Sequence, residues 1–365
     1  MSKHIPYESL KISNKSFFEA YQEKSKKIIE SGWYILGSEL ESFENAFAGY
    51  IGVKHCIGLA SGLDALILAL MALDLPPHSE VLVAANAYVA CILSIERAGH
   101  IPVLIEPNIS TSNIDVSKLE EKITKNTRAI MPVHLYGYPC EMEVISALAK
   151  KHHLHIIEDC AQAHGAHYFG QKVGTFSTVS AFSFFPTKNL GALGDAGACL
   201  TNDDALATKL RALRNYGSHI KYHNDYIGIN SRLDELQAGF LNVKLPHLDL
   251  INDHKRNLAK LYDQNLDNRF QKPHHALGYH GVYHIYNIYT SQRDQLKKYL
   301  SDNNILTEIH YPIPPYRQKA LKERFDENAY PVSDKMHQST LSLPLSYGHT
   351  TDDILRVCEV INQFF

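Results

Sequence analysis

Short apolar segments alternate with helical patterns between about residues 52 and 200. The apolar segments are rich in Val, Ile and Leu on both faces, which is typical of strands buried in a parallel sheet. They are "HCIGLA", "EVLVAA", "IPVLIE", "RAIMPVHL", "LHIIED" and "VSAFSFF", and helical spacing occurs in "LDALILALMALDL", "CILSIERAG" and "EMEVISALAKKH". This alternation predicts an α/β fold with a mixed, mostly parallel sheet and helices packed on its faces.

The pattern changes in the carboxyl-terminal part of the chain. A long helical segment covers residues 249–266, a strand-rich segment follows at residues 282–290, and a further helix is expected at residues 293–304. A chain of 365 residues is too long for one small core. We therefore expect a large α/β domain at residues 1–245 and a smaller α+β domain at residues 246–365, with the first residues of the chain packing on the smaller domain.

Polar residues follow five of the predicted strands, at the points where the strands end. Ligand sites in open α/β sheets collect at the carboxyl ends of the strands. We therefore expect these polar side chains to face one region of the molecule. They are Ser61 and Gly62, Asn86 and Tyr88, His134, Asp159 and Gln162, and Ser183 and Lys188.

The overall composition is that of an ordinary globular protein, with 45% hydrophobic and 21% charged residues. A formal net charge of −3 gives no electrostatic footprint for nucleic acid or for an anionic membrane. The first residues lack the apolar core of a signal peptide, and charged or polar residues interrupt every apolar run before it reaches spanning length. We therefore expect a cytoplasmic protein that has neither nucleic acid nor a membrane as its partner.

The cysteines and histidines bear on redox state and metal binding. The six cysteines are scattered without paired spacing, which favours reduced, mostly buried thiols over a disulfide framework or a zinc knuckle. Among the 21 histidines, His153 and His155 would share one face of a strand. Neither an HExxH helix nor a cluster with ligand spacing accompanies them, so we expect no metal site.

Two polar positions have more than one interpretation when each is taken alone. Ser61 and Gly62 stand between a strand and a helix, where they could help to bind a phosphate or Ser61 could simply cap the helix. Asp159 could bind a ribose, a metal ion or the ring nitrogen of pyridoxal phosphate. The ribose interpretation lacks its GxGxxG turn, because the glycines after Lys188 follow a GxxGxxG spacing. A nicotinamide enzyme is therefore the weaker hypothesis.

Lys188 lies in the stretch "SAFSFFPTKNLGALGDAGACL", between an apolar strand and a cluster of glycines. A lysine that binds phosphate would normally follow its glycines, whereas this one precedes them. Pyridoxal phosphate needs a lysine for its aldehyde, an acid for its ring nitrogen, a phosphate cradle and an aromatic side chain to stack on the ring. The candidates are Lys188 for the aldehyde, Asp159 for the ring nitrogen, Ser61, Gly62 and Ser183 for the phosphate, and Tyr88 for stacking.

Motifs along nearly the whole chain resemble the DegT/DnrJ/EryC1/StrS family of sugar aminotransferases, which have the aspartate aminotransferase fold, type I among transferases that depend on pyridoxal phosphate. The resemblance rests on "SGWYILGSELESFE", "LASGLDAL", "ANAYVACILSI", "VHLYG", "IIEDCAQAHGA", "SFFPTKNLGALGDAGA", "LRNYGS", "GINSRLDELQAGFL" and "IHYPIPP". It implies pyridoxal 5'-phosphate as the cofactor, with pyridoxamine 5'-phosphate formed in one half of the reaction, and a homodimer.

The resemblance also implies a role for individual residues. Lys188 would bind the cofactor covalently as a Schiff base and act as the catalytic residue, and Asn230 would reach the phosphate of the neighbouring subunit. The remaining cofactor contacts would be Asp159 at the ring nitrogen, Gln162 at the ring hydroxyl, Tyr88 on the ring face, and Ser61, Gly62 and Ser183 at the phosphate. Trp33, Tyr34, His310 and Tyr311 match positions that border the nucleotide-sugar pocket. For His134 and His164, a structural role in the pocket wall is at least as good an interpretation as a catalytic one.

The implied reaction moves an amino group from L-glutamate to a keto sugar carried on a nucleotide. The motifs resemble the branch that acts at C3 of dTDP-3-oxo-6-deoxyhexoses, as in deoxyamino sugar biosynthesis for O-antigen lipopolysaccharide. Thr187 and Tyr316 depart from the pattern of close relatives, which leaves the sugar, including gluco or galacto configuration, open. One alternative is a 4-aminotransferase of a dTDP- or UDP-4-keto-6-deoxy sugar, and another is a regulatory protein that binds the cofactor without turnover. Lys188 argues against the dehydratase branch, where histidine replaces the lysine.

Overall fold

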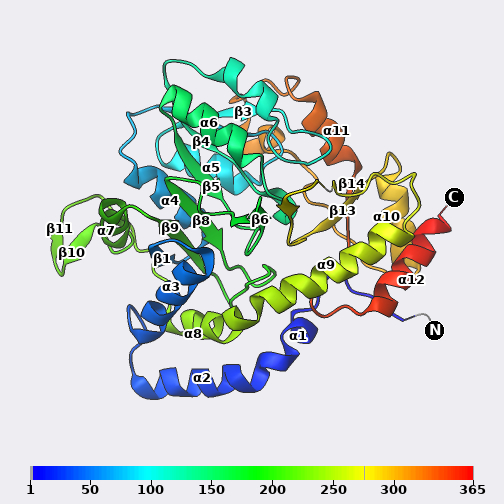
Figure 1. The fold of residues 1–365 in the computed structure, drawn as a ribbon, viewed down its shortest axis with the longest axis horizontal. Helices are drawn as coiled ribbons and strands as arrows, with labels where there is room; N and C mark the ends of the chain where they lie inside the picture. The colour runs from blue at the N-terminus through cyan, green and yellow to red at the C-terminus, as the bar shows by residue number, and fades with distance from the viewer. Residues whose placement is uncertain (1–2, 275, 365) are drawn as a thin grey trace.

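A computed structural model describes residues 3–274 and 276–364 of the chain. A seven-stranded sheet lies at its centre, with the strand order β1-β9-β8-β5-β4-β2-β3 (Figure 1). The strands are β1 (His55–Leu59), β2 (Glu80–Ala84), β3 (Ile101–Ile105), β4 (Thr127–Met131), β5 (His155–Asp159), β8 (Val179–Ser183) and β9 (Gly197–Thr201).

Six strands of this sheet point in the same direction. The strands β2, β3, β4, β5 and β8 pair in parallel, whereas β9 runs antiparallel to both β8 and β1. Because both neighbours of β9 run opposite to it, β1 points in the same direction as the other five strands. The predicted mixed, mostly parallel sheet is confirmed, and the carboxyl ends of six strands meet at one edge.

Helices cover the two faces of the sheet. On β9, Ala198 and Leu200 face one cluster of buried side chains, and Cys199 between them faces the other. The cluster around Cys199 includes the apolar helix α4, whereas α3 and α8 contribute to the opposite cluster. The helices of this part are α3 (Ser38–Ile51), α4 (Gly62–Ala72), α5 (Val89–Arg97), α6 (Met142–His152), α7 (Asp204–Leu213) and α8 (Glu235–Lys244).

The carboxyl-terminal part has a separate core of its own around a two-stranded antiparallel sheet, β13 (Tyr286–Tyr289) with β14 (Thr340–Leu343). Ile5 pairs with Ile305 and lies in this core. The helices are α9 (Leu248–Asn265), α10 (Arg293–Asp302), α11 (Pro331–Ser339) and α12 (Thr351–Asn362).

Helix α9 connects the two parts and runs from beside α8 toward α10 and α12 (Figure 1). Its first residue, Leu248, packs in the core next to α8, whereas Leu258 and Tyr262 pack in the carboxyl-terminal core. Tyr316 and Leu321, although late in the chain, belong to the large core around α4. The domain boundary at residue 245 therefore stays a prediction.

The remaining elements are short or peripheral. The hairpin formed by β10 and β11 projects from the body of the molecule beyond α7 (Figure 1). These elements are α1 (Leu10–Ser13), α2 (Phe18–Ser31), β6 (His167–Tyr168), β7 (Gln171–Lys172), β10 (Ser218–Ile220), β11 (His223–Asn224) and β12 (Tyr279–His280). The 3-10 turns are η1 (Lys15–Phe17), η2 (Val116–Lys118), η3 (Glu120–Lys122), η4 (Leu135–Gly137), η5 (Leu245–His247), η6 (Pro315–Arg317) and η7 (Lys319–Leu321).

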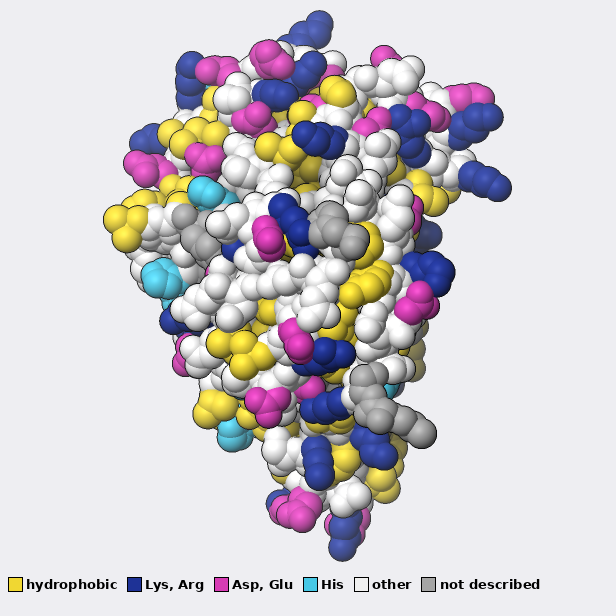
Figure 2. Space-filling model, turned by 90° about the vertical axis from the view of Figure 1, so that its right-hand side faces the viewer, with side chains coloured by type: hydrophobic (Ala, Val, Ile, Leu, Met, Phe, Trp, Pro, Cys, Tyr) yellow, Lys and Arg dark blue, Asp and Glu magenta, His cyan; other side chains and the backbone are white. Residues whose placement is uncertain are grey.

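The distribution of surface charge and the state of the cysteines agree with the expectations drawn from composition. Lys and Arg side chains lie interspersed with Asp and Glu on the face shown in Figure 2, which fits the small net charge. All six cysteines are buried and free, as predicted. Within the part of the chain that the structure describes, none of the helices is both long and apolar enough to cross a membrane.

Candidate active site

A cavity of about 320 Å³ lies at the edge of the sheet where the carboxyl ends of the parallel strands meet. Its walls come from the loops after β1, β2, β4, β5 and β8, and from the segment around residues 310 and 311. The sequence-predicted residues that border it are Ser61, Gly62, Tyr88, His134, Asp159, Gln162, Ser183, Lys188, His310 and Tyr311. The strand-end rule thus brings most of the candidate residues to one place.

One end of the cavity is formed by the start of helix α4. Ser61 is its N-cap, and the Ser61 Oγ accepts a hydrogen bond of 3.1 Å from the Asp64 backbone N–H. A Cβ atom at Gly62 would lie 2.5 Å from the Ser183 Cβ, so only glycine lets the end of β8 approach this turn. The first N–H groups of a helix and its dipole favour an anion. This end of the cavity is therefore suited to a phosphate.

Lys188 lies in the loop after β8 and is partly buried. Its backbone N–H donates a 2.8 Å hydrogen bond to the Phe185 carbonyl, and a Cβ atom at Gly191 would lie 2.3 Å from the Pro186 carbonyl oxygen. The glycine therefore lets the loop fold back tightly. Burial lowers the pKa of Lys188 to about 8, with Asp159 opposing that effect. Roughly a tenth of the amine is then neutral, and so nucleophilic, at pH 7.

Asp159 is the last residue of β5, and its side chain is nearly buried. One carboxylate oxygen, Oδ1, accepts a 2.9 Å hydrogen bond from the Ala161 backbone N–H. The other, Oδ2, lies 3.0 Å from the Cys91 Sγ. A carboxylate held in this way can pair with a protonated nitrogen of a ligand in the cavity.

Gln162 connects two aromatic walls of the cavity. Its Oε1 accepts a 2.6 Å hydrogen bond from the Tyr136 backbone N–H, and its Nε2 donates to the Tyr311 hydroxyl at 2.9 Å. The ring of Tyr311 lies 4.9 Å from the half-exposed ring of Tyr88. Burial also raises the pKa of Tyr311, so its hydroxyl stays protonated. Both rings are available to contact a planar ligand.

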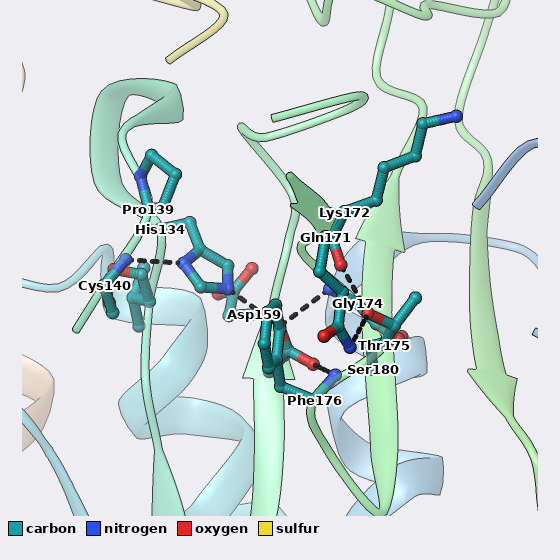
Figure 3. A network of polar contacts seen from close by, with 12 residues as sticks. His134, Pro139, Cys140, Asp159, Gln171, Lys172, Gly174, Thr175, Phe176 and Ser180 are labelled. Carbon is teal, nitrogen blue, oxygen red and sulfur yellow. Dashed lines mark hydrogen bonds and ion pairs between the residues drawn. The ribbon is translucent and has the colours of Figure 1, made fainter. Parts of the chain in front are cut away.

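His134 borders the cavity as part of a fully buried hydrogen-bond network, which Figure 3 shows together with Cys140, Gly174 and Phe176. The Cys140 backbone N–H donates to the His134 Nδ1 at 3.0 Å, so the ring proton resides on Nε2. That Nε2 lies 3.1 Å from the Glu158 Oε1 and donates to it. The backbone N–H groups of Gly174 and Phe176 also donate to Glu158, at 2.7 and 3.0 Å. Both ring nitrogens are thus engaged, and we infer a structural role for His134.

The same network contains a potential metal-binding group, because ligand atoms of His134, Glu158 and Cys160 lie within 4.8 Å of one another. Both nitrogens of His134 and both oxygens of Glu158 are, however, already hydrogen-bonded to protein groups. A metal ion would have to displace these bonds. We therefore do not propose a metal centre here, and its absence stays a prediction.

The other histidines near the cavity are held neutral. His164 is buried, its ring lies 5.5 Å from that of Phe182, and burial and the charge of Lys188 lower its pKa to about 3. His310 borders the cavity, its Nδ1 lies 2.9 Å from the Ser342 Oγ, and burial lowers its pKa to about 4. His284 also borders the cavity, and burial lowers its pKa well below its ordinary value. Neutral rings here avoid repulsion of the Lys188 ammonium.

Sequence reasoning missed two titratable residues that border the cavity, His284 and Asp195. His284 lies in the segment "VYHIYNIYT", where the strand pattern gave no sign of contact with a site formed by earlier strands. Asp195 follows Gly194 in the glycine cluster. The strand-end rule selects residues that directly follow a predicted strand, and neither His284 nor Asp195 does.

Several predicted residues lie outside this cavity. Trp33 and Tyr34 are 63% and 49% exposed, and Trp33 borders a different hollow of about 730 Å³ next to Glu235. Asn230 is exposed and forms an isolated bridge with Asn215. None of these three residues borders the cavity of its own chain.

The two departures from the family pattern differ in position. Thr187 borders the cavity. Tyr316 is buried elsewhere, and its hydroxyl donates a 2.8 Å hydrogen bond to the Asp334 Oδ1. Of the two, only Thr187 is placed to affect a ligand.

Comparisons with known proteins agree with this geometry. The sequence profile of the DegT/DnrJ/EryC1/StrS aminotransferase family matches residues 17–362. The chain is 48% identical, over 99% of both sequences, to the dTDP-3-amino-3,6-dideoxy-alpha-D-galactopyranose transaminase of Aneurinibacillus thermoaerophilus. It is 40% identical to the dTDP-3-amino-3,4,6-trideoxy-alpha-D-glucose transaminase of Streptomyces venezuelae, over 99% of this chain and 96% of the relative. The crystal structure of S. venezuelae DesV superposes with a TM-score of 0.97, at 40% identity, over 99% of this chain and 98% of DesV.

Proposed function

Because the chain belongs to the DegT/DnrJ/EryC1/StrS aminotransferase family, we propose that it transfers an amino group from L-glutamate to C3 of a dTDP-3-oxo-6-deoxyhexose. Its fold and its class, a sugar aminotransferase of a family that depends on pyridoxal phosphate, are as the sequence predicts. The names of both relatives above describe an amine at C3 of a dTDP-linked sugar, which supports C3 over C4. The observation that carries the proposal is the position of Lys188 in the same cavity as Asp159 and the Ser61 turn, where burial of its amine lowers the pKa of Lys188 to about 8.

Pyridoxal 5'-phosphate fits the groups that this cavity presents. The start of α4, with Ser61, Gly62 and Ser183, would hold its phosphate, and the amine of Lys188 would bind its aldehyde carbon. The other contacts would come from Asp159 at the ring nitrogen, Gln162 at the ring hydroxyl and Tyr88 on the ring face. When bound, this cofactor supplies an electron sink that makes the substrate carbon bearing the amine acidic enough to exchange its proton.

The side chains of the cavity would have different roles in amino transfer. The Lys188 Nζ accepts the proton from the substrate carbon and returns it at the end of the transfer. The negative charge of Asp159 would stabilise a positive charge on the ring nitrogen. Gln162 and Tyr311, which share a hydrogen bond, would hold the ring in position. His310 and Tyr311 border the remaining space and are placed to contact the sugar.

The proposed substrate can be tested with purified protein, L-glutamate and a panel of dTDP- and UDP-linked keto sugars. We expect an aminated product from a dTDP-3-oxo-6-deoxyhexose, detected by mass spectrometry, with the new amine located at C3 by NMR. The gluco and galacto sugars are offered separately, because the preference for one configuration of a single hydroxyl depends on the shape of the cavity wall. An amine at C4 would favour the 4-aminotransferase alternative. Cofactor binding without any product would favour a regulatory protein.

We further propose a homodimer in which Asn230 completes the cavity of the neighbouring subunit. Asn230 is exposed and follows a segment with unusually exposed apolar side chains, including Tyr222 at 86% and Ile227 at 91%. Exposed apolar residues of this kind are typical of a surface that contacts another protein. Trp33 and Tyr34, also exposed and outside their own cavity, would lie at the same contact. A cytoplasmic location and an O-antigen product stay predictions.

The dimer is tested by co-expressing two impaired variants, Lys188→Ala and Asn230→Ala. If each site combines Lys188 of one subunit with Asn230 of the other, a mixed dimer contains one intact site. We expect Asn230→Ala alone to weaken cofactor binding by a factor of about ten or more, since it removes a hydrogen bond to a charged group. Co-expression should restore turnover at limiting cofactor concentration. A rate equal to the average of the two separate variants would show that Asn230 does not act across the interface.

A further inference from the structure

The carboxylate of Asp159 has a protein partner that the proposed reaction leaves without a role. Cys91 lies in the first turn of α5 and is fully buried. Its Sγ is 3.0 Å from the Asp159 Oδ2, while the Asp159 Oδ1 accepts the Ala161 N–H. Each oxygen of the carboxylate therefore has a separate neighbour within the protein, one a thiol and the other a backbone amide.

The thiol is the donor in this contact. Burial raises the pKa of Cys91 well above its ordinary value, and the nearby charge of Asp159 raises it further. Cys91 therefore keeps its proton, and a carboxylate is a pure acceptor when ionised. A thiol is a weak donor, but a hydrogen bond to an ionised acceptor is stronger than one between neutral groups.

We propose that Cys91 is a positioning residue for Asp159: its thiol holds the carboxylate toward the ring-nitrogen position and withdraws part of its negative charge. The proposal rests on the proposed function, because it assigns Cys91 a role through the group that faces the cofactor. A hydroxyl in place of the thiol would donate more strongly, and a methyl group would not donate at all. The contact therefore sets where the Asp159 carboxylate points and how much of its hydrogen-bonding capacity is left for a ligand.

The titratable groups that interact electrostatically with Asp159 come from several elements. They are Lys188 in the loop after β8, Cys140 before α6, Cys160 after β5, Tyr311 in the segment next to His310, and Cys91 itself. Burial raises the pKa of each of the thiols and of the phenol, so these groups are neutral at physiological pH. Lys188 is the cationic member of this set. A substitution at Cys91 should therefore act mainly on the protonation equilibrium of the nitrogen at Lys188.

The chain offers a matched control for any substitution at Cys91. Cys199 on β9 is also fully buried, and its Sγ donates to the Ala65 carbonyl oxygen at 3.0 Å. Replacing Cys199 by alanine removes the same atoms and a similar hydrogen bond without touching Asp159. The loss of packing is comparable, so a difference between the two variants reports on the carboxylate contact.

The first experiment uses the cofactor-free protein and infrared spectroscopy of the S–H stretching region. Subtracting the Cys91→Ala spectrum from that of the wild type isolates the Cys91 band, and the Cys199→Ala difference isolates the Cys199 band. We expect the Cys91 band at lower frequency, because an ionised carboxylate is a stronger acceptor than a backbone carbonyl. The Cys91 band should move up in Asp159→Asn. Bands at the same frequency, or no response to Asp159→Asn, would overturn the proposal.

The second experiment titrates the visible absorption of the protein loaded with pyridoxal phosphate. In Cys91→Ala, Asp159 faces the site with more negative charge, which favours a protonated nitrogen nearby. The pH midpoint of the absorption change should therefore rise by roughly half a unit, and losing the orientation that the thiol gives the carboxylate should weaken cofactor binding about threefold to tenfold. Cys91→Ser should titrate at or slightly below the wild-type midpoint, because its hydroxyl donates more strongly, and Cys199→Ala should titrate close to the wild type. A Cys91→Ala midpoint equal to that of Cys199→Ala would refute the role. Wild-type protein that binds no cofactor would refute the proposed function instead, and the infrared result would still decide whether the thiol bonds to Asp159.

Discussion

Replacing Lys188 by alanine is expected to lower turnover by a factor of about 10³ or more. The variant loses both the amine that binds the cofactor aldehyde and the group that moves the substrate proton. Two other buried lysines, Lys244 and Lys255, also have a pKa lowered to about 8 by burial. They are not placed to replace Lys188, because neither borders the 320 Å³ cavity and both donate to asparagine side chains. Turnover is measured as the initial rate of aminated product at saturating glutamate.

A covalent-link assay provides the control for this variant. Borohydride should fix the cofactor onto the wild-type peptide that contains Lys188, as seen by mass spectrometry, and should leave Lys188→Ala unlabelled. Thermal unfolding followed by circular dichroism checks that the variant is folded. If folded Lys188→Ala turned over at the wild-type rate, or if the label appeared on Lys244 or Lys255, Lys188 would lose its assigned role.

Asp159→Asn should produce the second large effect, a fall in kcat of about 10²- to 10³-fold. The amide has nearly the same shape and can still accept the Ala161 N–H, so the fold of the β5 end should be preserved. It carries no charge, however, and cannot stabilise a positive charge on the ring nitrogen. The loss should appear in kcat more than in KM, because the charge of Asp159 would matter most in the step that moves electrons from the substrate carbon toward the ring.

A carboxylate far from the cavity serves as the comparison for Asp159. Asp334 accepts hydrogen bonds from Tyr316 and Arg317 and does not border the cavity. Asp334→Asn should therefore leave kcat within a factor of about three, allowing for a small loss of stability. An equal fall in kcat for both variants, or unchanged kcat in Asp159→Asn, would contradict the role of Asp159.

Much of the fold follows from local patterns in the chain. Strand β2 at Glu80–Ala84 and helix α9 at Leu248–Asn265 differ by only a residue or two from the predicted segments. Strand β9 was missed, because its five residues follow a glycine cluster that favours a loop and are too short to show a period. It forms a strand because it fills the gap between β8 and β1, a reason that lies in pairing and not in its own residues.

The candidate site was predictable where it depends on strand ends and unpredictable where it depends on packing. Ser61, Asp159 and Lys188 each follow a strand of a parallel sheet, so the topology alone brings them to one edge. Tyr316 directly follows the family motif "IHYPIPP", which contributes His310 and Tyr311 to the site, yet its ring lies in the core and its hydroxyl donates to Asp334. The identity of a residue in a motif does not fix the direction of its side chain.

By itself, the sequence determined the α/β architecture, the chemical groups available for catalysis and the edge of the sheet at which they gather. These features follow from local periodicity and from the fixed direction of parallel strands. Only the tertiary structure decided that both ring nitrogens of His134 are hydrogen-bonded, one to the Cys140 N–H and the other to Glu158, and that Cys91 donates to Asp159. These contacts depend on distances of about 3 Å between side chains that the sequence pattern does not relate, and close packing of the folded core sets such distances.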